Sequence, residues 1–345
     1  MTIKIRTLVL VIFLGLSTHS VAQDPVFDVH PSTQDPSVAV DFAQIKTWEN
    51  ELSNWGRWGS DDQRGTLNLI TREKTREAAR LVRDGVTVPL ARFVSEEVAM
   101  DSQRWVPTKH WMTMVDPTTG AVSAAMDAVS FGLHDGLLSH IDALCHYAAD
   151  RNGKRVIFNG YPQALDHDGC KDLAVDRMGS GYVTRGILVD MPLLKGVEWL
   201  EPGTPIYVSD LIEWEEYAGV KIDSGDALLI RGGRWAKRAK DGPWAYNRGG
   251  VGLHASVVPW LRERDIGLLV SDAVNDVQPS GVEGVNRPVH HLSLVFLGLP
   301  LVDNGYLEDV AREAAARHRW EFMVSWHITQ VPGGTASPFN AIATF

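Results

Sequence analysis

The sequence has few cysteines, no excess of positive charge and no long apolar run outside its first residues. Its 345 residues include two cysteines, Cys145 and Cys170, so at most one disulfide can form within the chain. The formal net charge of −10 argues against a nucleic-acid partner, because proteins that bind nucleic acids usually carry basic patches. A chain that is 44% hydrophobic and 22% charged has an ordinary globular composition, and this length suits one large domain or two small ones.

Motifs of several common enzyme classes are also missing. The sequence contains neither the G-x-S-x-G motif of α/β-hydrolases nor the H-E-x-x-H motif of zinc proteases. Val331–Pro338 (VPGGTASP) can expose successive backbone N–H groups to an anion, but it lacks the lysine of a P-loop and so does not indicate a nucleotide site. No unit of about 20 to 50 residues repeats along the chain, which argues against a repeat architecture.

The longest apolar run lies within residues 1–22 and has the pattern of a signal peptide. Lys4 and Arg6 form a charged start, and Leu8–Leu16 (LVLVIFLGL) is apolar but too short to span a bilayer. Small residues precede the expected cleavage site between Ala22 and Gln23. We therefore expect an exported protein, periplasmic or secreted, without a stable membrane anchor.

The stretch Phe131–Tyr147 (FGLHDGLLSHIDALCHY) concentrates side chains that bind metals or transfer protons. His134, His140, Asp142 and His146 all have the same parity, so an extended backbone would place them on one face. If the chain instead turned helical after Asp142, then Asp142 and His146 would still share a face. Either conformation predicts a divalent metal site with an imidazole left over for proton transfer. The alternative is a set of buried structural histidines.

The remaining chain mixes helices and strands without strict alternation. Residues 23–40 are rich in Pro, Asp and Ser and are predicted to be a disordered lead-in. Hydrophobic periodicity and capping residues predict helices at 41–55, from Thr71 towards Gly85, and at 209–217, 257–264 and 306–318. Asn304 is expected to cap the last of these helices. Apolar runs predict strands at 86–94, 184–191, 226–231, 266–271 and 320–328. This pattern favours a layered α/β (α+β) fold in a single catalytic domain covering 41–345.

Other residues are candidates for the same site. His290 or the adjacent His291, together with Asp303, can complete a metal shell begun by the central stretch, although a surface histidine and a helix-start aspartate are the alternatives. Trp105 and Trp111 lie in a segment, 103–115, whose weak periodicity predicts a loop or flap, and they are candidate substrate-binding residues. Cys145 would point away from the histidine face of an extended strand, and its pairing with Cys170 in an oxidising compartment is left open.

Six segments together resemble the cyclase family, which includes bacterial kynurenine formamidases and isatin hydrolase. They are residues 139–146 (SHIDALCH), 62–68 (DQRGTLN), 184–190 (TRGILVD), 225–231 (GDALLIR), 288–290 (PVH) and 331–341 (VPGGTASPFNA). The resemblance covers most of the mature chain. It implies a swivelling β/β/α fold, a homo-oligomer (a dimer or a tetramer) and a Zn²⁺ or Mn²⁺ site that hydrolyses amide-like C–N bonds.

The resemblance also implies roles for individual residues. His140 and Asp142 match metal ligands, His146 matches the catalytic acid and base, and His290 and Asp303 complete the metal site. The compact family motif has a further histidine where this chain has Gly136. His134 resembles the spacing of longer members, and whether it replaces that ligand is left open.

These observations predict an exported, metal-dependent hydrolase of a small amide, aryl formamide or cyclic amide. The tryptophan-rich loops suggest an aromatic or flat substrate. The alternatives are lactone hydrolysis, cyclisation or dehydration on the same metal site, or a ligand-binding protein that has lost catalysis.

Overall fold

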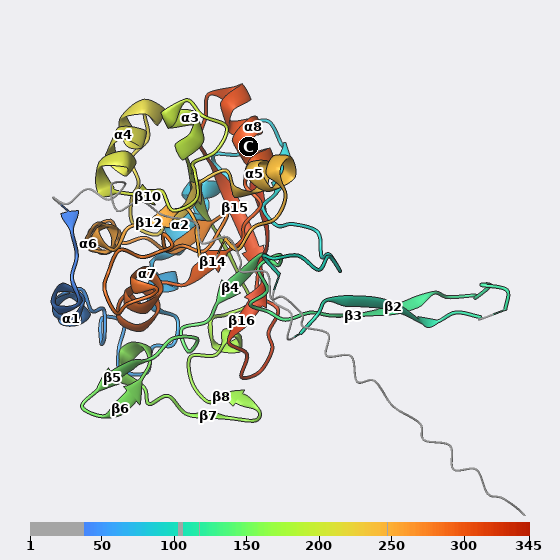
Figure 1. The fold of residues 1–345 in the computed structure, drawn as a ribbon, viewed down its shortest axis with the longest axis horizontal. Coiled ribbons are helices and arrows are strands. Elements are labelled where there is room, and N and C mark those ends of the chain that lie inside the picture. Colours follow the sequence, from blue (N-terminus) through green and yellow to red (C-terminus); the bar gives the residue numbers. More distant parts are fainter. Residues whose placement is uncertain (1–37, 103–105, 117, 247) are drawn as a thin grey trace, which may run out of the picture.

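A curled sheet of nine strands lies at the centre of the protein (Figure 1). The computed structural model describes residues 38–102, 106–116, 118–246 and 248–345. In spatial order the sheet consists of β1 (Thr87–Pro89), β17 (Asn340–Thr344), β15 (Glu321–His327), β9 (Gly181–Asp190), β11 (Ala227–Arg231), β13 (Leu268–Ser271), β14 (Leu301–Asp303), β4 (His140–Asp142) and β16 (Ala336–Pro338). The four strands β9, β11, β13 and β14 run parallel to one another, and the outer strands pair antiparallel.

The parallel strands form the core because their apolar runs are buried on both faces. Ile187–Val189 of β9, Ala227–Ile230 of β11 and Leu268–Val270 of β13 are all buried. Continuous runs of this kind are typical of strands covered by other layers on both sides. The sheet is therefore an interior layer, and its far end carries β4 and β16.

Helices cover this sheet, and three pairs of short strands lie outside it. The helices are α1 (Phe42–Glu51), α2 (Arg72–Ala79), α3 (Met191–Lys195), α4 (Val208–Ala218), α5 (Arg234–Asp241), α6 (Val258–Glu263), α7 (Pro288–His290) and α8 (Glu308–Arg317), with a π-helical segment η7 (His291–Leu297) and short 3₁₀ turns η3 (Gly65–Leu69), η4 (Phe158–Gly160), η5 (Val175–Arg177) and η6 (Ala255–Val257). Helices α2, α4 and α8 contact β9, whereas α1 and α6 contact η7. The paired short strands are β10 (Pro205–Ile206) with β12 (Gly252–Leu253), β5 (Ala149–Arg151) with β6 (Lys154–Val156), and β7 (Leu165–Asp166) with β8 (Gly169–Cys170).

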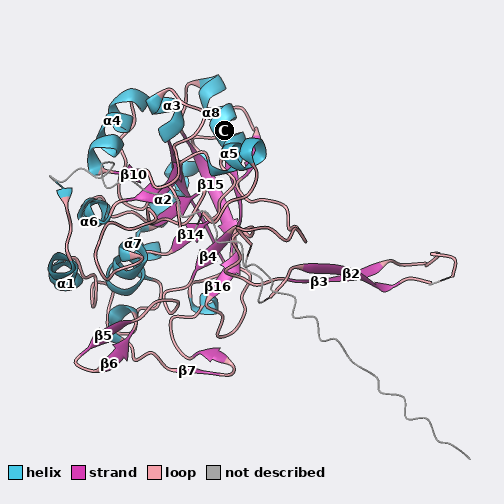
Figure 2. Cartoon of the chain, in the orientation of Figure 1, coloured by secondary structure: helices cyan, strands magenta, loops and turns pink. Residues whose placement is uncertain are grey.

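A two-stranded ribbon projects away from the body (Figures 1 and 2). It consists of β2 (Lys109–Met114) and β3 (Met126–Ser130), and all of β2 is exposed. Within the expected loop or flap over 103–115, residues 109–114 form a strand, whereas the described residues 106–108 and 115 are irregular. The weak periodicity of its sequence has a physical reason: with no face of β2 buried, nothing selects alternating apolar and polar residues.

Most predicted elements are present, with shorter ends. Thr71 caps α2 as expected, and its hydroxyl accepts from the backbone N–H of Lys74 at 3.2 Å. The expectation that Asn304 caps the last helix is wrong, since α8 begins at Glu308. Asn304 instead adopts a left-handed backbone conformation (φ 61°), and its amide donates to the carbonyls of Asp135 and Leu138. The central motif is extended at β4, so the helical alternative after Asp142 does not occur.

The predicted signal peptide, and the lead-in up to residue 37, lie outside the described residues. Within the described part of the chain, no helix is both long enough and apolar enough to cross a bilayer.

Candidate metal centre

Three imidazoles and two carboxylates meet where β4 pairs with β14. His140 and Asp142 are alternate residues of β4, so their side chains share a face of the sheet. The antiparallel register places Asp303 of β14 directly opposite His140. His290 comes from α7, and His134 comes from the turn that precedes β4. Segments far apart in the sequence therefore supply one cluster.

Asp142 lies at the centre of this cluster. Its Oδ1 is 3.3 Å from Nδ1 of His134 and 3.6 Å from Nε2 of His140. Its Oδ2 is 3.6 Å from Nε2 of His290, and that nitrogen is 3.4 Å from Oδ2 of Asp303. The donor atoms form two sets, His134–His140–Asp142 and Asp142–His290–Asp303, and within each set they lie within 4.8 Å of one another. Mixed nitrogen and oxygen sets of this kind suit a borderline divalent ion such as Zn²⁺ or Mn²⁺.

Hydrogen bonds orient two of the imidazoles. Nδ1 of His140 donates to the carbonyl of Leu138 at 2.9 Å, which leaves Nε2 turned towards the cluster. Nδ1 of His290 hydrogen-bonds to Asp276, which is held in turn by backbone N–H groups of α7. Partners of this kind fix the ring orientation of metal-binding histidines. Both rings therefore present Nε2 to the ligand sets.

Asp303 and His134 are held in the same way. Oδ1 of Asp303 accepts from the backbone N–H of Asn275 at 3.2 Å and from its side-chain amide at 2.7 Å, which leaves Oδ2 for the cluster. Nε2 of His134 hydrogen-bonds with the hydroxyl of Thr335 at 3.0 Å, which leaves Nδ1 facing Asp142. Each ligand therefore keeps a donor atom that points inwards.

The chemistry of these atoms fits a bound cation. Both carboxylate oxygens of Asp142 and Nε2 of His290 are buried, and none has a hydrogen-bond partner among the described residues. Burial raises the pKa of Asp142, but the neighbouring imidazoles outweigh it and hold that pKa far below its usual range. Burial opposes the protonation of His290, whereas Asp303 and Asp276 raise its pKa well above the ordinary value. The cluster thus stabilises positive charge, which a divalent ion supplies better than a proton.

His146 lies beside the ligand sets and belongs to neither of them. Its ring stacks on that of His134, with centroids 4.0 Å apart and planes 13° apart. Burial lowers the pKa of His146 to about 4, against the opposing effect of Asp142. Its ring is therefore neutral at pH 7, so that it can accept a proton.

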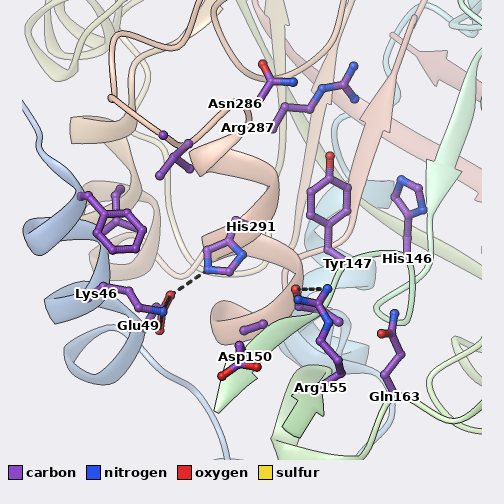
Figure 3. A pocket seen from close by; sticks show the side chains of 16 residues that line it. Lys46, Glu49, His146, Tyr147, Asp150, Arg155, Gln163, Asn286, Arg287 and His291 are labelled. Atoms are coloured by element: carbon purple, nitrogen blue, oxygen red, sulfur yellow. Dashed lines mark hydrogen bonds and ion pairs between the residues drawn. The ribbon is translucent and has the colours of Figure 1, made fainter. Parts of the chain in front are cut away.

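Two adjoining cavities give access to the cluster. An inner cavity of about 290 Å³ is lined by ligands from both sets and by His146, Tyr147, Tyr246 and Arg287. An outer cavity of about 510 Å³ shares His146, Tyr147 and Arg287 with it. Figure 3 shows the outer cavity, with Tyr147 pointing towards Arg287 and His146 beside Tyr147.

Gly136 explains why this chain has no histidine four residues before His140. A Cβ atom there would lie 1.9 Å from the backbone oxygen of Asp101, and so only glycine fits. The turn around this glycine brings His134 to Asp142 instead.

The structure brings together the predicted ligands His134, His140, Asp142, His290 and Asp303, with His146 beside them. The choice between the adjacent histidines is also clear from the geometry. His290 is fully buried in the cluster, whereas Nε2 of His291 pairs with Glu49 at 2.9 Å in the outer cavity.

The predicted substrate-binding tryptophans are not at this cluster within the described chain. Trp111 lies on the projecting ribbon, is 47% exposed, and is not among the described residues that line either cavity. Its strand carries it away from the body of its own chain (Figure 1). Trp105 falls outside the described residues.

Sequence reasoning missed several residues at the site. Tyr147, Tyr246 and Arg287 line the inner cavity, and Asp276 orients His290. Two of them had a usable signal, since Tyr147 directly follows His146 and Arg287 directly precedes the PVH segment at 288–290.

Comparisons with known proteins agree with this geometry. A sequence model of the family described as "Putative cyclase" matches residues 68–275. The crystal structure of a novel cyclase superposes with a TM-score of 0.73 at 27% identity, over 86% of this chain and 99% of that one. The search of curated proteins gave no match.

More distant likenesses concern the fold alone. Isatin hydrolase A from Ralstonia solanacearum has a TM-score of 0.53 at 19% identity, over 75% of this chain and 91% of that one. An isatin hydrolase bound to the product analogue thioisatinate has a TM-score of 0.52 at 17% identity, over 77% and 93%. The mixed α/β fold expected from the sequence is thus confirmed.

Proposed function

This chain belongs to the cyclase family, and we propose that it is a metal-dependent hydrolase that cleaves a C–N bond in a small amide, aryl formamide or cyclic amide. The observation that carries the proposal is the shared carboxylate of Asp142. It joins two sets of ligand atoms at the cavity wall, with a neutral imidazole, His146, beside them. The likeness of the fold to isatin hydrolases supports the choice of a C–N bond.

The protein's residues divide the reaction between them. His134, His140, Asp142, His290 and Asp303 would hold Zn²⁺ or Mn²⁺, an ion that polarises a carbonyl oxygen and lowers the pKa of water. His146 accepts a proton from the attacking water as the new C–O bond forms, because its ring is neutral at pH 7. It then returns that proton to the leaving nitrogen as the C–N bond breaks, so the ring of His146 becomes neutral again.

The first test is metal content. We expect about one or two equivalents of Zn or Mn in the purified mature protein, lost in a His140→Ala, Asp142→Ala double variant. A wild-type protein that stays empty after incubation with Zn²⁺ and Mn²⁺ would exclude the mechanism. Turnover of formamides, cyclic amides and lactones is then compared. Turnover of lactones alone would show that the C–N specificity is wrong.

We also propose that the chain is exported and that it forms a homo-oligomer. A disulfide between Cys145 and Cys170 supports export, because such bonds persist in oxidising compartments. The exposed ribbon supports association with a second copy. An isolated hairpin is marginally stable in water, and this one exposes Trp111, Met112 and Met114. Mass spectrometry of the mature N-terminus and sedimentation with and without the ribbon would test the two proposals.

A further inference from the structure

Arg287 stands at the junction of the two cavities. It lines both of them, together with His146 and Tyr147. Arg287 directly precedes Pro288, the first residue of α7, so the helix that carries the metal ligand His290 also fixes the start of this side chain. Figure 3 shows Arg287 on the side of Tyr147 to which the hydroxyl points. A ligand that passes from the outer cavity to the metal ligands therefore passes this guanidinium.

The guanidinium of Arg287 has no partner among the described residues. The side chain is half-buried, yet it makes no hydrogen bond or ion pair with any residue that the structure describes. Arginine has five N–H donors. Leaving these donors without acceptors in a partly desolvated position costs free energy. The position is therefore better suited to binding a ligand than to stabilising the empty protein.

The other cations of the outer cavity already have partners. Lys46 pairs with Glu49 at 2.7 Å. Arg155 lies across the β5–β6 ladder from Asp150, and its guanidinium donates to the backbone carbonyl of Ala148 at 3.0 Å. Opposite charges at facing positions of an antiparallel pair attract one another. Among the described charged residues of the cavity lining, Arg287 is thus the cation whose guanidinium makes neither a hydrogen bond nor an ion pair.

The nearby carboxylates are committed to other groups. Asp303 accepts from Asn275 and faces His290, and Asp276 accepts from His290 and from the backbone of α7. Burial lowers the pKa of Arg287, but Tyr147, Asp303 and other nearby groups outweigh burial and raise that pKa above its ordinary value. Arg287 is therefore permanently charged, and no carboxylate of the described chain lies within ion-pair distance of it.

We propose that Arg287 binds a carboxylate of the substrate, so that the enzyme selects small planar amides that carry an anionic group near the scissile C–N bond. This inference rests on the proposed hydrolase function. The guanidinium fork matches a carboxylate with two parallel hydrogen bonds. The inner cavity holds about 290 Å³, so a ligand whose carbonyl reaches the metal ligands also has its other end near Arg287. The rings of Tyr147 and Tyr246 line the same space and suit a planar group.

The test compares a matched pair of substrates, 2-formamidobenzoate and formanilide, which differ by one carboxylate. For wild type we expect kcat/KM to favour the anionic substrate by about 10- to 100-fold, the usual effect of a charge-assisted hydrogen bond. In Arg287→Gln the preference should fall towards one, with unchanged metal content. The matched control is Arg155→Gln, which removes a cation from the same cavity and should keep the preference. A wild-type enzyme without the preference, or an Arg287→Gln enzyme that keeps it, would overturn the proposal.

A binding experiment separates this proposal from the hydrolase function. Benzoate and benzamide are titrated into the metal-loaded protein by calorimetry. Benzoate should bind about 10-fold or more weakly to Arg287→Gln than to wild type, while Arg155→Gln should match wild type. That result would support Arg287 as the carboxylate site even if neither formamide is hydrolysed. Equal benzoate affinity in wild type and Arg287→Gln would overturn it. If Arg287→Gln does not fold, Arg287→Lys takes its place, because it keeps the charge but loses the guanidinium fork. Weaker benzoate binding by Arg287→Lys than by wild type would then support the proposal, and equal binding would overturn it.

Discussion

The disulfide between Cys145 and Cys170 should contribute a large part of the stability of the region behind the candidate metal ligands. It joins residues 25 apart and ties the chain after β4 to the β7–β8 hairpin. In the chain-entropy model, closing a loop of about 25 residues lowers the entropy of the unfolded chain by about 12 cal/mol/K, which is about 3.5 kcal/mol at 25 °C. Replacing both cysteines with alanine should therefore lower the free energy of unfolding by about 3.5 kcal/mol.

Urea denaturation followed by tryptophan fluorescence measures this change. Divided by the unfolding entropy of a chain of this length, this loss of free energy corresponds to a fall in melting temperature of about 5 °C. Metal content should stay unchanged, because β4 is held on both sides by β14 and β16 whether or not the crosslink is present. The disulfide thus stabilises the surroundings of the site without supplying a ligand.

The reduced wild-type protein provides the control. Dithiothreitol should shift the urea midpoint of wild type towards that of the Cys145→Ala, Cys170→Ala variant, and it should not move the midpoint of the variant itself. A wild-type midpoint that is the same with and without reductant, at a concentration shown to reduce this buried disulfide, would refute the reasoning.

Three other perturbations test the site and the core. His146→Ala should lower kcat by about 10²- to 10⁴-fold with metal content unchanged, and loss of the metal would contradict its assignment as a proton carrier. Asp142→Asn should abolish metal binding in elemental analysis, because both ligand sets use this carboxylate; retention of a full equivalent would contradict the shared role. Burial raises the pKa of Asp272 from 3.8 to about 6. The folded state therefore holds this proton more tightly than the unfolded chain, and stability falls as the pH rises from about 4 to about 6. Relative to Asp272→Asn, wild type should lose about 3 kcal/mol of unfolding free energy over that window in urea titrations. If the unfolding free energies of wild type and Asp272→Asn change in parallel with pH, the pKa of Asp272 is not raised.

Local patterns in the sequence were sufficient to predict part of the site. His140 and Asp142 share a face because alternate residues of a strand always do, and the apolar spacer Ile141 indicates that the strand is buried. The buried strands β9, β11 and β13 were recognisable for the same reason, since their apolar runs exceed what an exposed strand carries. Such features depend only on neighbouring residues.

The family resemblance extended that prediction to distant ligands. His290 and Asp303 lie more than 140 residues from His140, and their spacing alone was weak evidence. The register of β4 on β14 sets Asp303 opposite His140, and Nε2 of His290 lies 3.4 Å from Oδ2 of Asp303. The choice of His290 over His291 followed from the fold, because α7 turns one ring into the cluster and the other towards Glu49.

By itself the sequence determined which segments are buried strands, where the ligand-type residues cluster, and which family the chain resembles. Only the tertiary structure decided that Asn304 does not cap α8, that the segment with Trp111 is a projecting ribbon, and that Arg287 faces a cavity without a partner among the described residues. The physical reason is the range of the interactions. Periodicity and capping act over a few residues, whereas strand register, cavity lining and the pairing of charges depend on contacts between segments that the whole packed fold brings together.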